Sequence, residues 1–207
     1  MRFPECRAVL VFAALPLAAA LAGCSQPPPP AAPAAPAAPA TPAFRAISQV
    51  EHGKWLVIGG GCHDCHTPKK LGPNGPEPDM SLMLSGHQEN DKVAAPYKGP
   101  KSQWTTHTND NLTAWSGPWG VSFAANLTPD ENTGLGIWTE DMFVKALKLG
   151  KHMGASRQIL PPMPWNYYGQ LPDEDLKAMF AYLKSIPAIR NKVPVPLDPA
   201  GKPIEAP

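Results

Sequence analysis

The 207-residue chain is poor in charge and in cysteine, and its one marked apolar run lies at the N-terminus. Charged residues make up 17% of the chain and the formal net charge is +1. This balance does not provide the basic face that nucleic-acid phosphates require, and it argues against a nucleic-acid partner. The run Ala8–Ala22 is too short and too rich in alanine to predict a membrane-spanning helix. The length suits one folded domain with a tail.

Residues 1–23 have the organisation of a bacterial secretory signal, because two arginines precede the apolar run. The run ends in Leu21-Ala22-Gly23-Cys24, which resembles a lipobox, where the cysteine is lipidated and becomes the first mature residue. The alternative is an ordinary cleavable signal with an incidental cysteine. Removing the signal takes away Cys6, two arginines and one glutamate, which leaves 16 basic and 16 acidic residues. We expect a periplasmic lipoprotein anchored through Cys24 in the inner or the outer membrane. Ser25 stands where an aspartate is often associated with retention in the inner membrane, which weakly favours the outer membrane.

Residues 24–43 form a tether, almost wholly proline and alanine from Gln26 onward. Such a segment cannot build a core and favours extended polyproline II, so at about 3.1 Å per residue it reaches up to ~55 Å. It either lets an anchored carrier reach several partners or serves as a solubilising spacer. The folded domain is expected at 44–190, followed by a proline-rich C-terminal tail, 191–207, that we expect to be loosely ordered.

The stretch Cys62-His63-Asp64-Cys65-His66 is the most informative part of the chain. Two thiols three positions apart, with a histidine directly after the second, match the pattern of covalent c-type haem attachment. On a helical turn, Cys62 and Cys65 can reach two vinyl groups of one porphyrin edge while His66 lies beneath the iron. The sequence therefore predicts one covalent haem c with His66 as an iron ligand.

Two other uses of the thiols stay open. A disulfide redox pair calls for a βαβ setting, which does not flank this motif. A tetrahedral zinc site needs a second ligand pair, and His87 and His107 are isolated in the sequence.

A first helix is predicted over Phe44–Gly59, where a glycine triplet stops it. One predominantly apolar side is formed by Ile47, Val50, Trp55, Val57 and Ile58. Gly53 in the middle costs about 1 kcal/mol relative to alanine. The close approach of another helix would explain this glycine, and an unremarkable position on a surface face is the alternative.

Two more helices are expected later in the domain. Thr139 is a fitting N-cap for a helix that ends at Gly150. The last helix opens at Pro172 and closes before Pro187, with apolar residues at helical spacing between them.

The span Lys69–Gly120 is long, weakly periodic and rich in glycine, proline, asparagine and tryptophan. It is predicted as irregular, with a short helical turn at Leu82–Leu84. Irregular spans of this length are usually functional, and a haem edge is the candidate around which it wraps. Its tryptophans, Trp104, Trp115 and Trp119, either pack on that edge, present a docking face or fill the core.

Met163 stands between Pro162 and Pro164, which fix the direction of its backbone. A methionine with a fixed backbone is well suited to point its thioether at a metal. It is poorly suited to fill an irregular gap in the core, which is the usual role of a flexible methionine. The sequence predicts Met163 as the second iron ligand. The alternatives are Met153, His152, Met80, Met83 and His87.

Several separated motifs together resemble a monohaem class I c-type cytochrome, and more narrowly the haem modules in cytochrome subunits of membrane-bound alcohol and gluconate dehydrogenases. These motifs, besides the CxxCH, are Asn126-Leu127-Thr128-Pro129-Asp130, Thr133-Gly134-Leu135-Gly136-Ile137-Trp138-Thr139, Pro162-Met163-Pro164-Trp165 and Asp173-Glu174-Asp175-Leu176. The similarity covers roughly Gln49 to Pro187. Those subunits carry several haem modules, whereas this chain has one CxxCH.

The resemblance implies an all-α, cytochrome c-like fold in which the N- and C-terminal helices cross near Gly53 around one covalent haem, with a long irregular middle region. It also implies ligation by His66 and Met163. A backbone carbonyl at Pro73 or Pro76 is expected to accept the Nδ1 proton of His66. Trp138 is expected either to donate its indole N–H to a haem propionate or to pack in the core.

The function these predictions favour is electron transfer, with no substrate chemistry of the chain's own. A membrane-anchored carrier of this kind exchanges single electrons with a redox donor and an acceptor, such as a dehydrogenase, a terminal oxidase or another cytochrome. Ligation by methionine and burial both raise the reduction potential. One alternative is a haem enzyme or small-ligand-binding haem protein with an open distal site, and another is a haem-bearing sensor or structural subunit.

Overall fold

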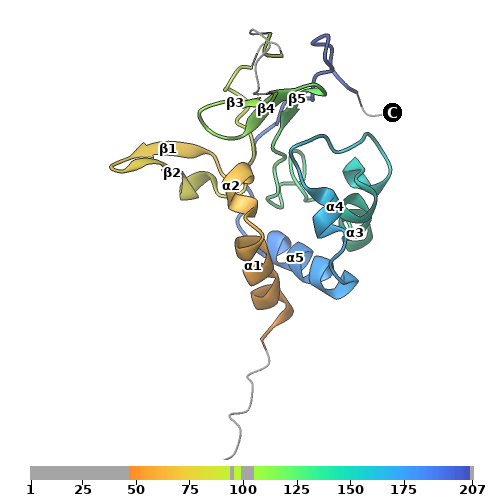
Figure 1. The fold of residues 1–207 in the computed structure, drawn as a ribbon. Helices are drawn as coiled ribbons and strands as arrows, with labels where there is room; N and C mark the ends of the chain where they lie inside the picture. The colour runs from red at the N-terminus through yellow and green to blue at the C-terminus, as the bar shows by residue number, and fades with distance from the viewer. Residues whose placement is uncertain (1–46, 94–95, 99–104, 206–207) are drawn as a thin grey trace, which may run out of the picture. The chain divides into compact units, whose positions relative to one another are not determined.

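The computed structural model describes residues 47–93, 96–98 and 105–205 (Figure 1). These residues lie within one compact unit, Phe44–Pro207. The predicted signal peptide, the lipidation at Cys24 and the tether lie outside the described residues, as does Trp104. In the described part of the chain, no helix is long and apolar enough to cross a bilayer.

The first helix, α1 (Gln49–Gly59), begins where a side chain caps it. Ser48 Oγ accepts a hydrogen bond of 3.1 Å from the Glu51 amide, which satisfies one of the free N–H groups of the first turn. Because the backbone of Ser48 is extended, the helix begins at Gln49 and not at Phe44 as predicted. Its predicted end at Gly59 is confirmed.

Helix α1 packs against the last helix, α5 (Asp173–Ser185), at a glycine (Figure 1). A Cβ atom added to Gly53 would overlap the carbonyl oxygen of Ala178. The two helix backbones therefore touch at this point, and a residue with a side chain does not fit. The predicted close approach of another helix at Gly53 is confirmed.

This contact decides which side of α1 is buried. Val57 follows Gly53 by about one turn, so it lies on the same side, and it is fully buried. The other apolar residues of the predicted side are partly exposed: Ile47 at 49%, Val50 at 39%, Trp55 at 59% and Ile58 at 45%. The apolar side expected from the sequence thus faces mostly away from α5.

A short helix and a hairpin follow. Helix α2 (Cys62–His66) begins after Gly61, whose φ of 69° is in the left-handed region that favours glycine. Strands β1 (Lys69–Gly72) and β2 (Gly75–Pro78) then pair antiparallel. A 3-10 turn, η1 (Met80–Leu82), comes next, two residues earlier than the helical turn that was predicted.

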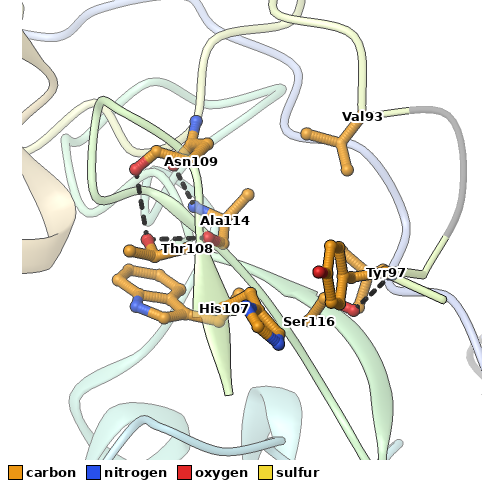
Figure 2. A pocket seen from close by; sticks show the side chains of 9 residues that line it. Val93, Tyr97, His107, Thr108, Asn109, Ala114 and Ser116 are labelled. Carbon is orange, nitrogen blue, oxygen red and sulfur yellow. Dashed lines mark hydrogen bonds between the residues drawn. The ribbon is translucent and has the colours of Figure 1, made fainter. Parts of the chain in front are cut away.

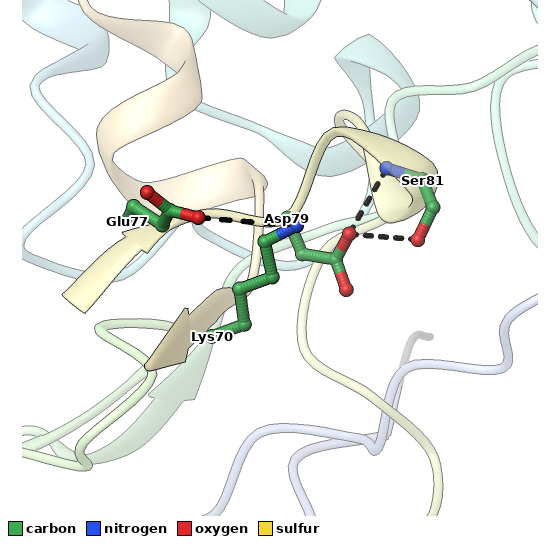
Figure 3. A network of polar contacts seen from close by, with 4 residues as sticks. All are labelled: Lys70, Glu77, Asp79 and Ser81. Atoms are coloured by element: carbon green, nitrogen blue, oxygen red, sulfur yellow. Dashed lines mark hydrogen bonds and ion pairs between the residues drawn. The ribbon is translucent and has the colours of Figure 1, made fainter. Parts of the chain in front are cut away.

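Exposed polar contacts shape the end of this hairpin (Figure 3). Lys70 Nζ lies 3.9 Å from Glu77 Oε1 across the two strands. Asp79 Oδ1 caps η1 by accepting hydrogen bonds from the hydroxyl and the amide of Ser81, at 2.7 and 3.0 Å. These two bonds hold the pKa of the Asp79 carboxyl below its usual value.

A second sheet has the strand order β3 (His107–Thr108), β4 (Ala114–Gly117) and β5 (Gly120–Phe123), with antiparallel neighbours. Both sheets lie within or next to the span that was predicted to be irregular. Strands of two to four residues are too short to show an alternating pattern. The sequence therefore does not predict how these strands pair.

The residues after α5 pack back onto the domain (Figure 1). The backbones of Leu197 and Val121 exchange two hydrogen bonds of 2.9 Å. Asn191 is 2% exposed, and its Nδ2 donates to the carbonyls of Ser85 and His87 at 2.7 and 2.9 Å. The expectation of a loosely ordered tail is wrong for residues 191–205, because the amides between the prolines still find partners.

The remaining helices are α3 (Glu140–Leu149), η2 (His152–Gly154) and α4 (Trp165–Tyr168). As predicted, Thr139 caps α3 by accepting a hydrogen bond from the Met142 amide, and Gly150 ends the helix. The core cluster draws its residues from α1, α3, α5 and the loops beside them. It contains Val57, Leu84, Leu135, Phe143, Val144, Leu147, Leu176, Met179, Phe180, Tyr182, Leu183 and Ile186.

We predict that Gly53→Ala lowers the free energy of unfolding by about 1–3 kcal/mol, because the new methyl group forces the two helix backbones apart. Gly59→Ala is the matched control in the same helix, since nothing lies within 4 Å of a Cβ at that position. It is expected to be neutral or stabilising by up to about 1 kcal/mol. Urea unfolding of both variants measures the difference, and equal midpoints would contradict the helix contact.

Candidate functional site

The three residues of the predicted attachment motif lie on one helical turn. Helix α2 places Cys62 and Cys65 one turn apart and ends with His66. Both cysteines are free thiols and half-buried, while His66 is buried. The three side chains that were predicted to hold one haem are thus neighbours.

The His66 ring is fixed by a single hydrogen bond. Its Nδ1 lies 2.7 Å from the carbonyl oxygen of Ala125, so Nδ1 carries the proton and donates it. Within the described residues, the ring makes no other hydrogen bond, which leaves the lone pair of Nε2 available. Burial lowers the pKa of His66 more than the bond to Ala125 raises it, so the ring is neutral at pH 7. A neutral imidazole is the form that binds a metal ion.

The acceptor for His66 differs from the one expected. The carbonyls of Pro73 and Pro76 were predicted, but both prolines lie at the tip and second strand of the β1–β2 hairpin. Ala125 is 59 positions away from His66 in the sequence. Since any residue carries a backbone carbonyl, no pattern in the sequence identifies this partner.

The segment 84–87 holds this arrangement together. The amide of Gly86 donates to the carbonyl of His66 at 2.8 Å, and the amide of His87 donates to that of Ala124 at 2.9 Å. Gly86 has a φ of 79°, and a Cβ there would overlap the carbonyls of Ala124 and Ala125. Glycine at this position therefore lets the segment pass directly beside the carbonyl that orients His66.

The thiols do not have the character of a redox pair. Burial raises the pKa of Cys62 to about 11, and it also raises that of Cys65. Reactive cysteines in disulfide exchange have lowered pKa values, because the thiolate is the nucleophile. In the part of the chain that the structure describes, no group of three or more His, Cys, Asp or Glu side chains is placed to hold a metal ion.

Lys69 closes the end of α2, a role the sequence analysis missed. Its ammonium group donates to the carbonyls of His63, Asp64 and Thr67 at 3.1, 2.9 and 2.6 Å. The last carbonyls of a helix have no partner within it, and a cation satisfies them well. A lysine just after the helix is the only hint in the sequence.

The loop that carries Met163 is tied to the neighbourhood of α2. Met163 is half-buried and packs against the core cluster. Five residues later, the Tyr168 hydroxyl donates to the carbonyl of Gly60, two positions before the first cysteine of the motif. On the other side, Ser122 Oγ donates to the carbonyl of Pro161. The loop is therefore held at both ends.

The Tyr168 hydroxyl has a raised pKa in this position beside α2. Burial raises its pKa to about 12, and the thiols of Cys62 and Cys65 contribute further to the rise. Because such an effect falls off steeply with distance, the ring lies beside the motif.

His87 and His107, the two histidines weighed as possible zinc ligands, have other partners. His87 is fully buried, with Nδ1 2.9 Å from Thr113 Oγ1 and Nε2 2.8 Å from the carbonyl of Asp91. Neither ring nitrogen is free to bind iron without losing a buried hydrogen bond. His107 lines a separate cavity in the β3–β5 region, where its ring centroid lies 3.9 Å from that of Tyr97 (Figure 2).

The alternative methionines are placed less favourably, with one exception. Met80 is 56% exposed. Met153 lies in η2 with a φ of 54° and is not among the described side chains that pack against the core cluster. Met83 does pack against it, as Met163 does. Met83 therefore joins Met163 among the methionines that pack against the core cluster.

Trp138 lies immediately before the N-cap of α3 and packs against the core cluster. Its ring meets the His152 ring edge-on, with 5.2 Å between centroids. Of the tryptophans of the middle region, Trp115 lines the cavity with His107 and Tyr97. The indole N–H of Trp119 donates to Ser122 Oγ at 3.3 Å.

No family model matches the chain. It is similar to the fructose dehydrogenase cytochrome subunit of Gluconobacter japonicus, with 26% identity over 153 residues, which covers 71% of this chain and 24% of the relative. The gluconate 2-dehydrogenase cytochrome c subunit of Pantoea cypripedii is 38% identical over 65 residues, 31% of this chain and 14% of the relative. For the quinone alcohol dehydrogenase cytochrome c subunit of Gluconobacter oxydans the identity is 37% over 82 residues, 37% of this chain and 16% of the relative.

The chain thus spans less than a quarter of the length of each of these relatives. The predicted resemblance to cytochrome subunits of alcohol and gluconate dehydrogenases is confirmed.

We predict that Lys69→Met lowers the free energy of unfolding by about 1.5–3 kcal/mol, the usual contribution of hydrogen bonds to a charged group. Lys70→Met is the matched control, because this neighbouring lysine is exposed and has one ion pair at 3.9 Å. Exposed pairs contribute roughly 0–1 kcal/mol. Urea unfolding compares the two variants, and a Lys69 variant as stable as the Lys70 variant would refute the capping role.

Proposed function

We propose that this chain is an electron carrier with one covalently attached haem c, a monohaem cytochrome that serves a dehydrogenase or another redox partner. The observation that carries the proposal is the buried His66 ring on the same turn as two free thiols. Its Nδ1 is bound to the Ala125 carbonyl, while Nε2 has no partner among the residues that the structure describes. The similarity to cytochrome subunits of dehydrogenases supports the same function and a dehydrogenase as partner.

The residues present fit a haem. Cys62 and Cys65 would form the two thioether links, and His66 would bind the iron through Nε2. Met163 is the proposed second axial ligand, supported by its place against the core cluster and by the anchored loop that carries it. When bound, the haem supplies one-electron chemistry between Fe(II) and Fe(III).

The chain's own residues set the conditions for that chemistry. The bond from Nδ1 to Ala125 keeps the proton off Nε2 and holds the ring in one orientation. Burial keeps the imidazole neutral. A neutral imidazole and a neutral thioether in an apolar setting disfavour the more highly charged ferric state, so both raise the reduction potential.

The proposal includes the fold class of the domain. A cytochrome c-like, all-α core with crossing terminal helices is supported by the α1–α5 contact at Gly53 and by a core cluster built from helices and their loops. In this view the two small sheets are additions outside that core. Lipidation at Cys24, the tether and a periplasmic location at the inner or outer membrane are proposed from the sequence.

Expression in a host with haem-attachment machinery is expected to add the mass of one haem to the polypeptide. Cys62→Ala with Cys65→Ala should remove this added mass completely, because no thioether can form. Intact-mass spectrometry makes the measurement. A wild-type chain without added mass would overturn the proposal.

For the second ligand, Met163→Ala is expected to abolish the sulfur-to-iron charge-transfer band of the oxidised protein. It should also lower the potential by a sizeable part of the roughly 0.8 V range over which axial ligands act. Met153→Ala is the control and should change neither. An unaltered spectrum of the Met163 variant would reassign the ligand, and a Met83→Ala variant would then be the next to measure.

A further inference from the structure

The β1–β2 hairpin projects from the domain just after the attachment motif (Figure 1). Strand β1 begins three residues after His66, and the Lys69 ammonium group fastens its start to the end of α2. Further along the strand, Leu71 is 87% exposed, the largest value for a large hydrophobic residue in the described part of the chain. A hairpin of two short strands is only marginally stable alone in water. The domain thus presents a small sheet whose most apolar side chain it does not cover.

The pairing of the two strands shows which backbone groups of the hairpin point outward. In an antiparallel pair, opposite residues alternate between exchanging two hydrogen bonds and exchanging none. Pro76 and Pro78 have no N–H to exchange. Their partners across the hairpin, Leu71 and Lys69, therefore belong to the pairs that exchange none. The Asp79 amide donates to the carbonyl of the residue before Lys69 at 2.8 Å, which is the bond that flanks such a pair.

The two edges of the hairpin are consequently different. On β2, the two prolines occupy the outward positions, so this edge offers no N–H donor there. Prolines of this kind prevent another strand from pairing with an edge. On β1, the N–H and C=O groups of Lys69 and Leu71 point away from β2, and none of the four is hydrogen-bonded to a described residue outside the hairpin. β1 is therefore the edge that is open to a further strand.

The side chains of β1 define which strand fits this edge. Neighbouring residues of a strand lie on opposite faces, so Lys70 is on one face of the hairpin and Leu71 on the other. Lys70 Nζ lies 3.9 Å from Glu77 Oε1, and these side chains are 54% and 50% exposed. An acidic residue opposite Lys70 on an added strand would give the ammonium group a second anion. An apolar residue beside it would cover Leu71.

A second copy of this chain fits the edge less well. Two β1 strands can pair antiparallel about a two-fold axis through the outward groups of Lys69 and Leu71. Lys70 of one copy would then lie opposite Lys70 of the other. Like charges directly opposite each other destabilise a sheet. The charge of β1 therefore favours a different chain with an acidic strand.

We propose that the outer edge of β1 binds an extended segment of another protein, in which acidic and apolar residues alternate, and adds it to the hairpin as a third strand. Main-chain hydrogen bonds supply affinity in this mode of recognition, and alternate side chains supply specificity. The bound segment lies beside the attachment motif. That its owner is the redox partner of the carrier rests on the function proposed above, whereas the edge itself does not.

The probe is a capped hexapeptide of alternating valine and glutamate, and a peptide of alternating valine and lysine is its charge-reversed control. NMR of the isotope-labelled full chain under reducing conditions follows the backbone amides as each peptide is added. The glutamate peptide is expected to shift the amides of Lys69 and Leu71. It should also slow hydrogen exchange at the Leu71 amide by about fivefold or more, as a hydrogen bond of ordinary strength does. An exchange rate that the glutamate peptide leaves unchanged overturns the site.

Substitution of Leu71 separates the backbone from the side chain. Leu71→Pro removes the outward N–H and leaves the bonds inside the hairpin, so it should weaken binding of the glutamate peptide by about fivefold or more. Leu71→Ala keeps the N–H and should cause a smaller loss. Leu149→Ala is the matched control, because Leu149 is a 54% exposed leucine at the end of α3, and it should bind like the wild type. Equal affinities of Leu71→Pro and Leu149→Ala contradict the addition of a strand.

The exchange of inner amides shows whether Leu71→Pro still forms the hairpin. Lys70 and Glu77 exchange two bonds inside it, so their amides should stay protected. If this protection is lost, Lys70→Gln decides instead, since it leaves the backbone intact. It should weaken the glutamate peptide by roughly twofold to fivefold, the range of an exposed ion pair. An unchanged affinity in Lys70→Gln overturns the acidic partner.

Two other results have a definite meaning. Self-association of the wild type that Leu71→Pro abolishes would overturn the acidic partner in favour of a second copy of the chain. A full chain that carries no haem would refute the proposed function, and the peptide titration of that same chain would still decide whether β1 binds a strand.

Discussion

The hydrogen bond from His66 Nδ1 to the carbonyl of Ala125 is the constraint on which the site depends. A five-residue helix cannot by itself fix the ring at its end. The bond supplies a fixed point from a distant part of the chain, and among the described residues it leaves the other ring nitrogen without a partner. Burial then keeps the ring neutral. One backbone carbonyl thus determines both the orientation of His66 and the atom that it presents.

The surrounding polar network keeps that carbonyl in place. Asn126, the next residue, is buried, and its Nδ2 donates to the carbonyl of Ile189 at 2.8 Å. Asn191 in turn binds the segment 84–87 that runs beside Ala125. The stretch after α5 is therefore part of the support for the site, although its prolines suggest a loose tail. Buried polar groups of this kind stabilise only when each has a partner, and no buried side-chain nitrogen or oxygen of the described residues lacks one.

A cation lies directly beside the motif. Lys69 places an ammonium group against the last carbonyls of α2. Cations near a redox centre favour its reduced state, as do neutral ligands and burial. In the proposed carrier these features act in the same direction, towards a high potential. The relatives are cytochrome subunits of dehydrogenases.

The sequence by itself determined the features that depend on neighbouring residues. These are the spacing of Cys62, Cys65 and His66 and the cap at Thr139. Only the tertiary structure decided which carbonyl orients His66, how Lys69 closes α2 and where the short strands pair. A local pattern reflects contacts between residues a few positions apart. A backbone carbonyl 59 positions away leaves no trace in residue type, because every residue has one.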